Sequence, residues 1–212
     1  ALHRHVRTIN IVSIPSDAIP DNELVADTDT GEMAEKTSRP EYGNVLFRHY
    51  DPDVMAALLP LLDELQFARV FGPATRIVMF SEGHGGLCTA PRPENLPIAP
   101  RGPLTINAGQ IEDLKLAMAE ARDMRVAAYL REFAPEAATD LDDHQLAHFV
   151  SESGTSGREL GLTTERAQGF WAYMMLNSKG KIARDEVVRD YIVSDPEKGT
   201  PDDKMYNLMR EL

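Results

Sequence analysis

The stretch from Asn44 to Met79 reads NVLFRHYDPDVMAALLPLLDELQFARVFGPATRIVM and determines the fold that we expect. Residues 44–49 alternate between apolar and polar side chains, as a half-buried strand does. Asp51 and Pro52 follow, and together they favour the start of a helix, because the aspartate oxygen can accept from a free backbone N–H and proline has none to satisfy. The stretch therefore predicts a strand, a turn and a helix.

A second helix and a second strand complete this stretch. Pro60 limits the first helix, and Asp63 stands where the N-cap of the next helix is needed. Gly72 and Pro73 end that helix, because glycine tolerates the left-handed backbone of a helix end and proline cannot continue a helix. Residues 76–80 are then expected to form the second strand.

Two further segments set the expected domain organisation. Residues 81–86 read SEGHGG, which is typical of the turn of a β-hairpin. Residues 91–103 contain five prolines, which favour extended chain over helix or sheet. We therefore expect an α+β lobe with a small antiparallel sheet and short helices over 1–90, a proline-rich linker over 91–103, and an all-helical bundle over 104–212.

Residues 14–42 are rich in Pro, Asp, Glu, Ser and Thr and hold few large apolar side chains. Such a segment cannot bury enough surface to offset the entropy lost on ordering. We expect a flexible surface loop here, inserted between a first helix at residues 1–9 and the strand that begins at 44.

Apolar side chains recur at helical spacing beyond residue 104. In the third helix of that lobe, Ala167, Phe170, Trp171 and Met174 are expected to form the face that packs in the core. Near the end of the chain, methionines and leucines form an apolar edge at residues 205–212. We expect this edge to pack on the sheet-containing lobe, on a second copy or on a partner, because flexible thioether side chains suit varied surfaces.

Composition and charge narrow the class of protein. The chain has 212 residues, of which 42% are apolar and 26% charged, and its formal net charge is −12. This charge opposes nonspecific binding to nucleic acid or anionic membranes, and no apolar run approaches the ~20 residues of a membrane span. A single cysteine, Cys88, forbids an internal disulfide and fits a reducing compartment. We expect a cytoplasmic protein.

Two residue pairs raise the question of catalysis. His144 and His148 share a helix face, but Gln145 stands where a zinc protease of the H-E-x-x-H type needs its glutamate. His84 and Cys88 lie beside a glycine-rich turn, yet no third group that would orient the histidine is identifiable. We expect no catalytic residue, no metal site and no cofactor. A small hydrolase that uses either pair remains the alternative, as does a regulatory helical module that binds another protein.

The order of several motifs resembles one known family. The segments are an arginine-rich helix at 1–9, the turn FRHYDP at 47–52, a leucine-rich helix followed by FGP at 71–73, and LGLTTER at 160–166. The first three resemble the second half of the adaptor family catalogued as domain of unknown function four-one-two-three, and the last is similar to a helix-turn-helix in the helical tail of many members. The residues that match in the central stretch are Phe47, Arg48, Tyr50, Asp51, Pro52, Leu58, Leu59, Leu62, Phe71, Gly72 and Pro73.

This resemblance implies a function. Members of the family are type VI secretion effector chaperones, usually encoded between a VgrG spike protein and a toxin. The resemblance implies an adaptor that holds a toxin effector protein in the cytoplasm and loads it onto the VgrG spike, without catalysis. Members normally carry a further lobe ahead of this point, so the chain is expected to lack that N-terminal lobe.

Six residues are candidates for partner binding. Three stand in the turn before the first helix of the central stretch, where a structural role is the competing interpretation: Asp51 caps the helix, Arg48 pairs with it or with a neighbour, and Tyr50 packs on the core. The other three are methionines of the helical lobe. The complete set is Arg48, Tyr50, Asp51, Met175, Met205 and Met209.

Overall fold

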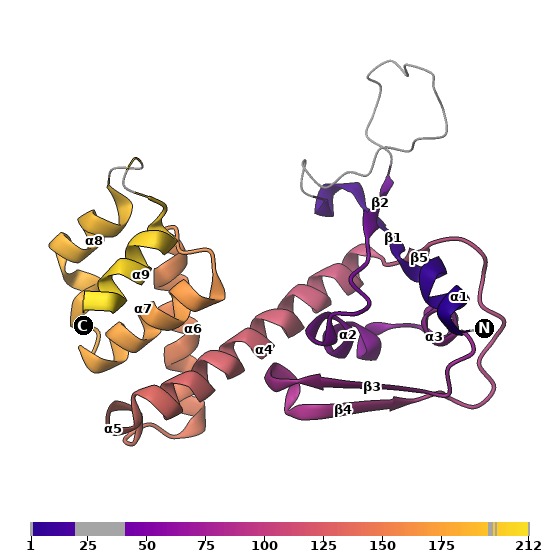
Figure 1. Cartoon of the computed structure of the whole chain (residues 1–212), viewed down its shortest axis with the longest axis horizontal. Coiled ribbons are helices and arrows are strands. Elements are labelled where there is room, and N and C mark those ends of the chain that lie inside the picture. The colour runs from indigo at the N-terminus through magenta and orange to yellow at the C-terminus, as the bar shows by residue number, and fades with distance from the viewer. Residues whose placement is uncertain (1, 20–40, 195–196, 198, 212) are drawn as a thin grey trace, which may run out of the picture. The chain divides into compact units, whose positions relative to one another are not determined.

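The structure is a computed structural model that describes residues 2–19, 41–194, 197 and 199–211. It divides into two compact units, residues 1–121 and 122–212, which are drawn from indigo to yellow along the chain in Figure 1. Small sheets and short helices make up the first unit, and helices make up the second. The fold is therefore α+β with a helical C-terminal region, as the sequence predicted.

A three-stranded sheet lies in the first unit, with β1 (Ile11–Pro15) in its centre. Strand β2 (Tyr42–Leu46) pairs with β1 in the antiparallel sense, and the short β5 (Leu104–Thr105) pairs with it in the parallel sense. The sheet is thus mixed rather than purely antiparallel. Val12 of β1 stands opposite both Val45 and Leu104, which places apolar side chains across the sheet.

The prediction of a loop over residues 14–42 was wrong at its start and also at its end, where Tyr42 belongs to β2. Ile14 and Pro15 belong to β1, and Ser16–Ala18 form a 3-10 turn. The cause is long-range pairing, because β1 is held by strands that follow it at 42 and 104. The remainder of that prediction, residues 20–40, lies outside the described residues. The expected N-terminal helix is present as α1 (Leu2–Val6), followed by the 3-10 turn η1 (Arg7–Ile9).

The order of elements in the central stretch is as predicted, although the strand expected at 44–49 is β2 and ends at Leu46. Helix α2 (Pro52–Leu58) begins at Asp51, whose carboxylate accepts from the backbone N–H of Asp53 and Val54 at 3.0 and 3.4 Å. Helix α3 (Glu64–Phe71) begins at Asp63, which forms a reciprocal capping box with Gln66. Strands β3 (Arg76–Ser81) and β4 (Gly86–Pro91) then form the predicted hairpin around a 3-10 turn.

The proline-rich segment 91–103 runs within the first unit and is fastened to α3. The guanidinium of Arg69 donates to the Gly102 carbonyl from Nε at 3.0 Å and from Nη2 at 2.8 Å. The amide of Gln66 donates to the Thr105 carbonyl at 2.6 Å, so the segment leads directly into β5. The division between the two units accordingly falls after Ala121, inside helix α4 (Ala108–Phe133), and not in this segment.

Helices α2 and α3 and the sheet enclose the core of the first unit. Its fully buried members include Phe71, Leu58 and Leu104. Partly buried residues of the hairpin, among them Ile77 and Met79, pack against this cluster. The opposite face of the hairpin is exposed, because the burial of β3 and β4 alternates along both strands.

The second unit is built from the end of α4 and from helices α5 (Pro135–Ala138), α6 (Asp143–Glu159), α7 (Glu165–Asn177), α8 (Glu186–Val193) and α9 (Pro201–Glu211). Trp171 of α7 is completely buried. One core cluster surrounds it, and a second cluster lies between α4, α6 and the other side of α7. Asp142 caps α6 through a capping box with Gln145, and Thr164 caps α7.

The expectation for the C-terminal apolar edge was wrong. Met205 of α9 is 0% exposed and packs inside the helical unit, in the same cluster as Trp171 and Ile192. Met175 and Met209 are half-buried against this cluster. The Asp202 carboxylate fixes α9 in place by accepting from the backbone N–H of Thr163 and Thr164 at 2.9 and 3.1 Å and from the Thr163 hydroxyl at 2.7 Å.

Candidate functional site

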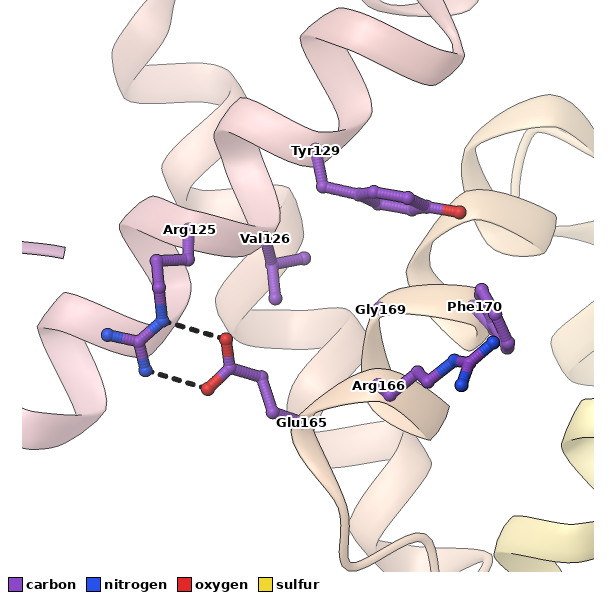
Figure 2. A pocket seen from close by; sticks show the side chains of 7 residues that line it. All are labelled: Arg125, Val126, Tyr129, Glu165, Arg166, Gly169 and Phe170. Atoms are coloured by element: carbon purple, nitrogen blue, oxygen red, sulfur yellow. Dashed lines mark hydrogen bonds and ion pairs between the residues drawn. The ribbon is translucent and has the colours of Figure 1, made fainter. Parts of the chain in front are cut away.

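A pocket of about 330 Å³ lies between α4 and α7, within the second unit (Figure 2). The residues that α4 contributes span one helical turn, and so do those of α7, so each helix presents one face to the pocket. Most of the lining is apolar, and charged side chains stand at its rim. The lining consists of Arg125, Val126, Tyr129, Glu165, Arg166, Gly169 and Phe170.

Aromatic rings form one wall of the pocket. The ring centroid of Tyr129 lies 4.9 Å from that of Phe133, 6.4 Å from that of Phe170 and 6.4 Å from that of Tyr173. Tilted rings at such separations attract one another beyond the gain from burial alone. The wall is therefore a cluster of mutually supporting rings, and Figure 2 shows the Tyr129 ring reaching across from α4 towards α7.

Gly169 is buried in the middle of α7 and forms the floor of the pocket. A glycine in a helix interior costs ~1 kcal/mol relative to alanine. Packing does not require it here, because a Cβ added at Gly169 would meet only Cδ1 of Tyr129, at an ordinary contact distance of 4.0 Å. What the missing side chain does provide is open space between α4 and α7.

Gly157 of α6 shows what a packing glycine looks like in the same unit. A Cβ added there would lie 3.3 Å from Cδ1 of Trp171 and 3.4 Å from Cδ1 of Leu162. The shorter of these distances is tighter than most real Cβ contacts, so a side chain at Gly157 would require the Trp171 ring to shift by a few tenths of an ångström. Gly169 is under no such constraint.

Arg125 and Glu165 form a bidentate ion pair at one end of the pocket (Figure 2). The guanidinium Nε and Nη2 donate to Oε1 and Oε2 of the carboxylate at 2.8 and 2.7 Å. Paired donors of this kind fix the geometry of both side chains. The Glu165 charge is thereby committed to Arg125.

Arg166 is held differently. Its guanidinium carbon lies 5.3 Å from the Phe170 ring centroid and 5.2 Å from that of Tyr206. These two rings contact each other edge to face at 5.8 Å, and a guanidinium over aromatic faces is stabilised by a cation–π interaction. In the described part of the chain, no carboxylate forms an ion pair with Arg166.

Tyr129 has an altered acidity. Burial raises the pKa of its phenol above the ordinary value of 10.0, the neighbouring Tyr173 raises it further, and the positive charge of Arg166 opposes both effects. Tyr129 is therefore neutral near pH 7. The effect of Arg166 on this pKa also means that its charge is felt inside the pocket.

Of the structural roles predicted for the three turn residues, the structure agrees with one and differs from two. Asp51 caps α2 as predicted. Tyr50 does not pack on the core as its structural interpretation required, since it is 71% exposed and makes only an edge contact with the His49 ring at 5.9 Å. Arg48 is exposed, and within the described residues no ion pair joins it to Asp51. These three residues belong to the first unit, whereas Met175, Met205 and Met209 belong to the second.

His84 has an orienting partner that the sequence did not reveal. Ser81, which is buried at the end of β3, donates to Oδ1 of Asp53 at 2.5 Å and contacts Nδ1 of His84 at 2.8 Å. Cys88 instead donates to the main-chain oxygens of His84 and Gly86, both at 3.6 Å. Among the described residues, no hydrogen bond joins the thiol to the imidazole, so the network fastens the hairpin turn to α2 and gives the hydrolase alternative no support.

His144 and His148 both face solvent on α6, as their spacing relative to the apolar stripe predicted. Nδ1 of His148 lies 3.5 Å from a carboxylate oxygen of Glu152, one helical turn away. Over the described ranges, the structure brings together no group of three or more residues that could hold a metal ion.

A second pocket, of about 290 Å³, lies in the first unit beside α3. Its polar side chains are already engaged, since Gln66 bonds to the Thr105 carbonyl and Arg69 to the Gly102 carbonyl. These bonds position the chain that leads into β5. We therefore take the pocket between α4 and α7 as the candidate site.

Comparisons with models of protein families, with curated proteins and with solved structures found no match. The resemblance to the type VI secretion adaptors thus remains a prediction from the sequence motifs. Of the helices that the structure describes, none combines the length and the apolar character needed to cross a membrane.

Proposed function

We propose that this protein is an adaptor that binds a segment of another protein in the pocket between α4 and α7. The observation that carries this proposal is Gly169, which opens space beneath an aromatic wall although neither backbone conformation nor packing requires a glycine there. A site that sacrifices helix stability to remain open is typical of a binding surface.

The chemistry of the lining favours binding over catalysis. Both carboxylate oxygens of Glu165 accept from guanidinium nitrogens of Arg125, which commits them to that ion pair. The raised pKa of Tyr129 makes its phenolate a minor species near pH 7. The remaining lining residues are apolar or are arginines, and arginine does not exchange a proton in this pH range.

The sequence resemblance supplies an identity for the partner. On that basis we propose that the bound protein is a toxin effector of a type VI secretion system, that the complex is delivered to the VgrG spike, and that binding takes place in the cytoplasm. An adaptor of this kind must shield an apolar segment of its partner until delivery, and an open apolar pocket suits that task.

The test compares capture by matched variants. The tagged wild-type protein, Gly169→Leu and Ala147→Leu would be purified from the native cell, and their partners quantified by mass spectrometry. Gly169→Leu fills the pocket, whereas Ala147→Leu adds a leucine on the exposed face of α6 in the same unit. We expect the partner to be lost from Gly169→Leu alone.

Two outcomes would count against parts of the proposal. Equal recovery of the same partners by wild type and Gly169→Leu would remove the pocket from partner binding. If Gly169→Leu loses a partner that is neither a toxin nor a spike protein, the protein is still an adaptor, but the assignment to type VI secretion is contradicted.

A further inference from the structure

Within the described residues, the pocket carries a positive charge, that of Arg166, which no ion pair offsets. Arg125 and Glu165 cancel each other through their bidentate ion pair. Arg166 contacts two aromatic rings, and none of the ion pairs in the described residues includes it. Arg166 therefore offers its charge at the edge of an otherwise apolar pocket.

The way Arg166 is held prepares it to bind an anion. The guanidinium carbon of Arg166 lies close to the Phe170 and Tyr206 rings, whose planes are 87° apart, so the planar group can lie flat against one ring at most. An arginine held beside aromatic rings in this way keeps N–H groups that can donate two parallel hydrogen bonds to a carboxylate. The aromatic contacts also restrict the side chain, which lowers the entropy lost when an anion binds.

The size of the pocket limits what can occupy it. About 330 Å³ is at the lower end of the range for small-molecule sites, which suits one apolar side chain better than a large cofactor. Val126, Tyr129 and Phe170 give that side chain an apolar surround. The charge at the rim then lies beside the place where the backbone of the bound segment would leave the pocket.

We propose that the pocket binds a protein segment in which a carboxylate accompanies a bulky apolar side chain, with the apolar group inserted above Gly169 and the carboxylate bound by Arg166. This inference rests on the proposed function, since it specifies the segment that the adaptor holds. We assign the carboxylate to an acidic side chain of the segment, because the charge of Arg166 lies beside the place where the backbone would continue out of the pocket; the end of a chain offers the same paired oxygens and is the other outcome of the test. The lowering effect of Arg166 on the pKa of Tyr129 agrees with a positive field directed into the pocket.

Three peptides of equal length test the inference on the full chain. The first carries phenylalanine and, four residues later, glutamate, and ends in an amide. The second has glutamine in place of the glutamate. The third has glutamine and a free terminal carboxylate next to the phenylalanine. Binding to the isotope-labelled protein would be followed by NMR at the amide of Gly169 and at Nε of Arg166.

We expect the glutamate peptide to bind up to about fivefold more tightly than the amidated glutamine peptide, which is the most that an ion pair at an exposed arginine provides. A preference shown by the third peptide alone would place the carboxylate at the end of a chain and contradict the side-chain assignment. The preference should shrink as salt is raised, because the charges are screened.

Two variants locate the effect. Arg166→Gln should make the three peptides bind equally, while Arg210→Gln, which removes a charge from the exposed face of α9, should preserve the preference. Arg166→Lys should preserve part of it, since lysine keeps the charge but not the paired donors.

Equal binding of all three peptides to the wild-type protein would overturn the inference, and so would a preference that survives in Arg166→Gln. If equal binding is abolished by Gly169→Leu, the pocket still holds an apolar side chain and the adaptor proposal stands without the carboxylate. Absence of binding by every peptide at millimolar concentration would also overturn the inference, while the capture experiment decides the adaptor proposal separately.

Discussion

Helix α7 is packed tightly around Trp171 and leaves a pocket beside Gly169. On the packed side, Trp171 is fully buried, and Gly157 of α6 has no side chain that would crowd its ring. On the open side, Gly169 lies beneath a pocket with space for a side chain that it does not have. The two glycines thus differ in effect. Gly157 allows α6 to pack closely on α7, whereas Gly169 leaves a space between α4 and α7. We therefore expect substitutions around Trp171 to change mainly the unfolding free energy, and substitutions at Gly169 to change mainly the binding of a partner.

The largest effect is expected from the packed side. Trp171→Ala removes the central ring of the cluster and should cost about 3–5 kcal/mol of unfolding free energy, as large-to-small changes in cores do. Phe170→Ala, on the neighbouring position that faces the pocket, should cost less than half as much because its ring is only half-buried. Urea denaturation measures both values, and equal losses would contradict the contrast between the two sides of α7.

Gly157→Ala is expected to destabilise the protein although alanine favours a helix. The new methyl group would press against Trp171 and Leu162, which should cost about 1–3 kcal/mol, the usual size of overpacking. The same denaturation measurement tests this. A stabilised Gly157→Ala protein would mean that the cluster around Trp171 can yield, and that it is not the rigid side of α7.

The raised pKa of Tyr129 should make the unfolding free energy depend on pH above about pH 10. Its pKa is raised in the folded protein above the ordinary value of 10.0, so around and above pH 10 the folded state retains a proton that the unfolded state loses. Unfolding free energy should therefore fall as pH rises from 10 through the folded-state pKa, and it should be unaffected by this group below that range.

Tyr129→Phe, which keeps the ring and removes the titrating hydroxyl, should flatten this dependence. Denaturation midpoints measured between pH 8 and 10.5 would test it. Identical slopes for the wild type and Tyr129→Phe would show that burial does not hold the phenol in its neutral form.

The sequence predicted the features of the fold that depend on neighbouring residues. Asp51 and Asp63 cap their helices as expected, because a cap satisfies N–H groups only two or three residues away. Strand β1 was missed, because its partners β2 and β5 lie far along the chain. The pattern of residues within a short segment does not indicate which distant strand will pair with it.

The candidate site was harder to predict than the fold. Helical periodicity assigned Phe170 to the core face and could not show that α4 leaves space above Gly169. It also left Met205 on an open edge, although Asp202 fixes α9 so that Met205 is buried. In both cases the neighbouring helix decides the environment. The one local signal was a glycine in the middle of an otherwise regular helix.

Gly169→Ala tests the central claim most directly, because it separates stability from binding with a single methyl group. Alanine should raise the unfolding free energy by up to ~1 kcal/mol, since it favours the helix and its Cβ meets only Tyr129 at 4.0 Å. The same variant should capture less of the partner than the wild type, because the methyl group occupies the floor of the pocket.

The measurement is therefore paired: urea denaturation and quantitative partner capture on the same preparation of Gly169→Ala and wild-type protein. The account predicts a more stable protein that binds more weakly. A destabilised Gly169→Ala protein, or one that is more stable and binds its partner fully, would contradict the claim that Gly169 keeps a binding pocket open.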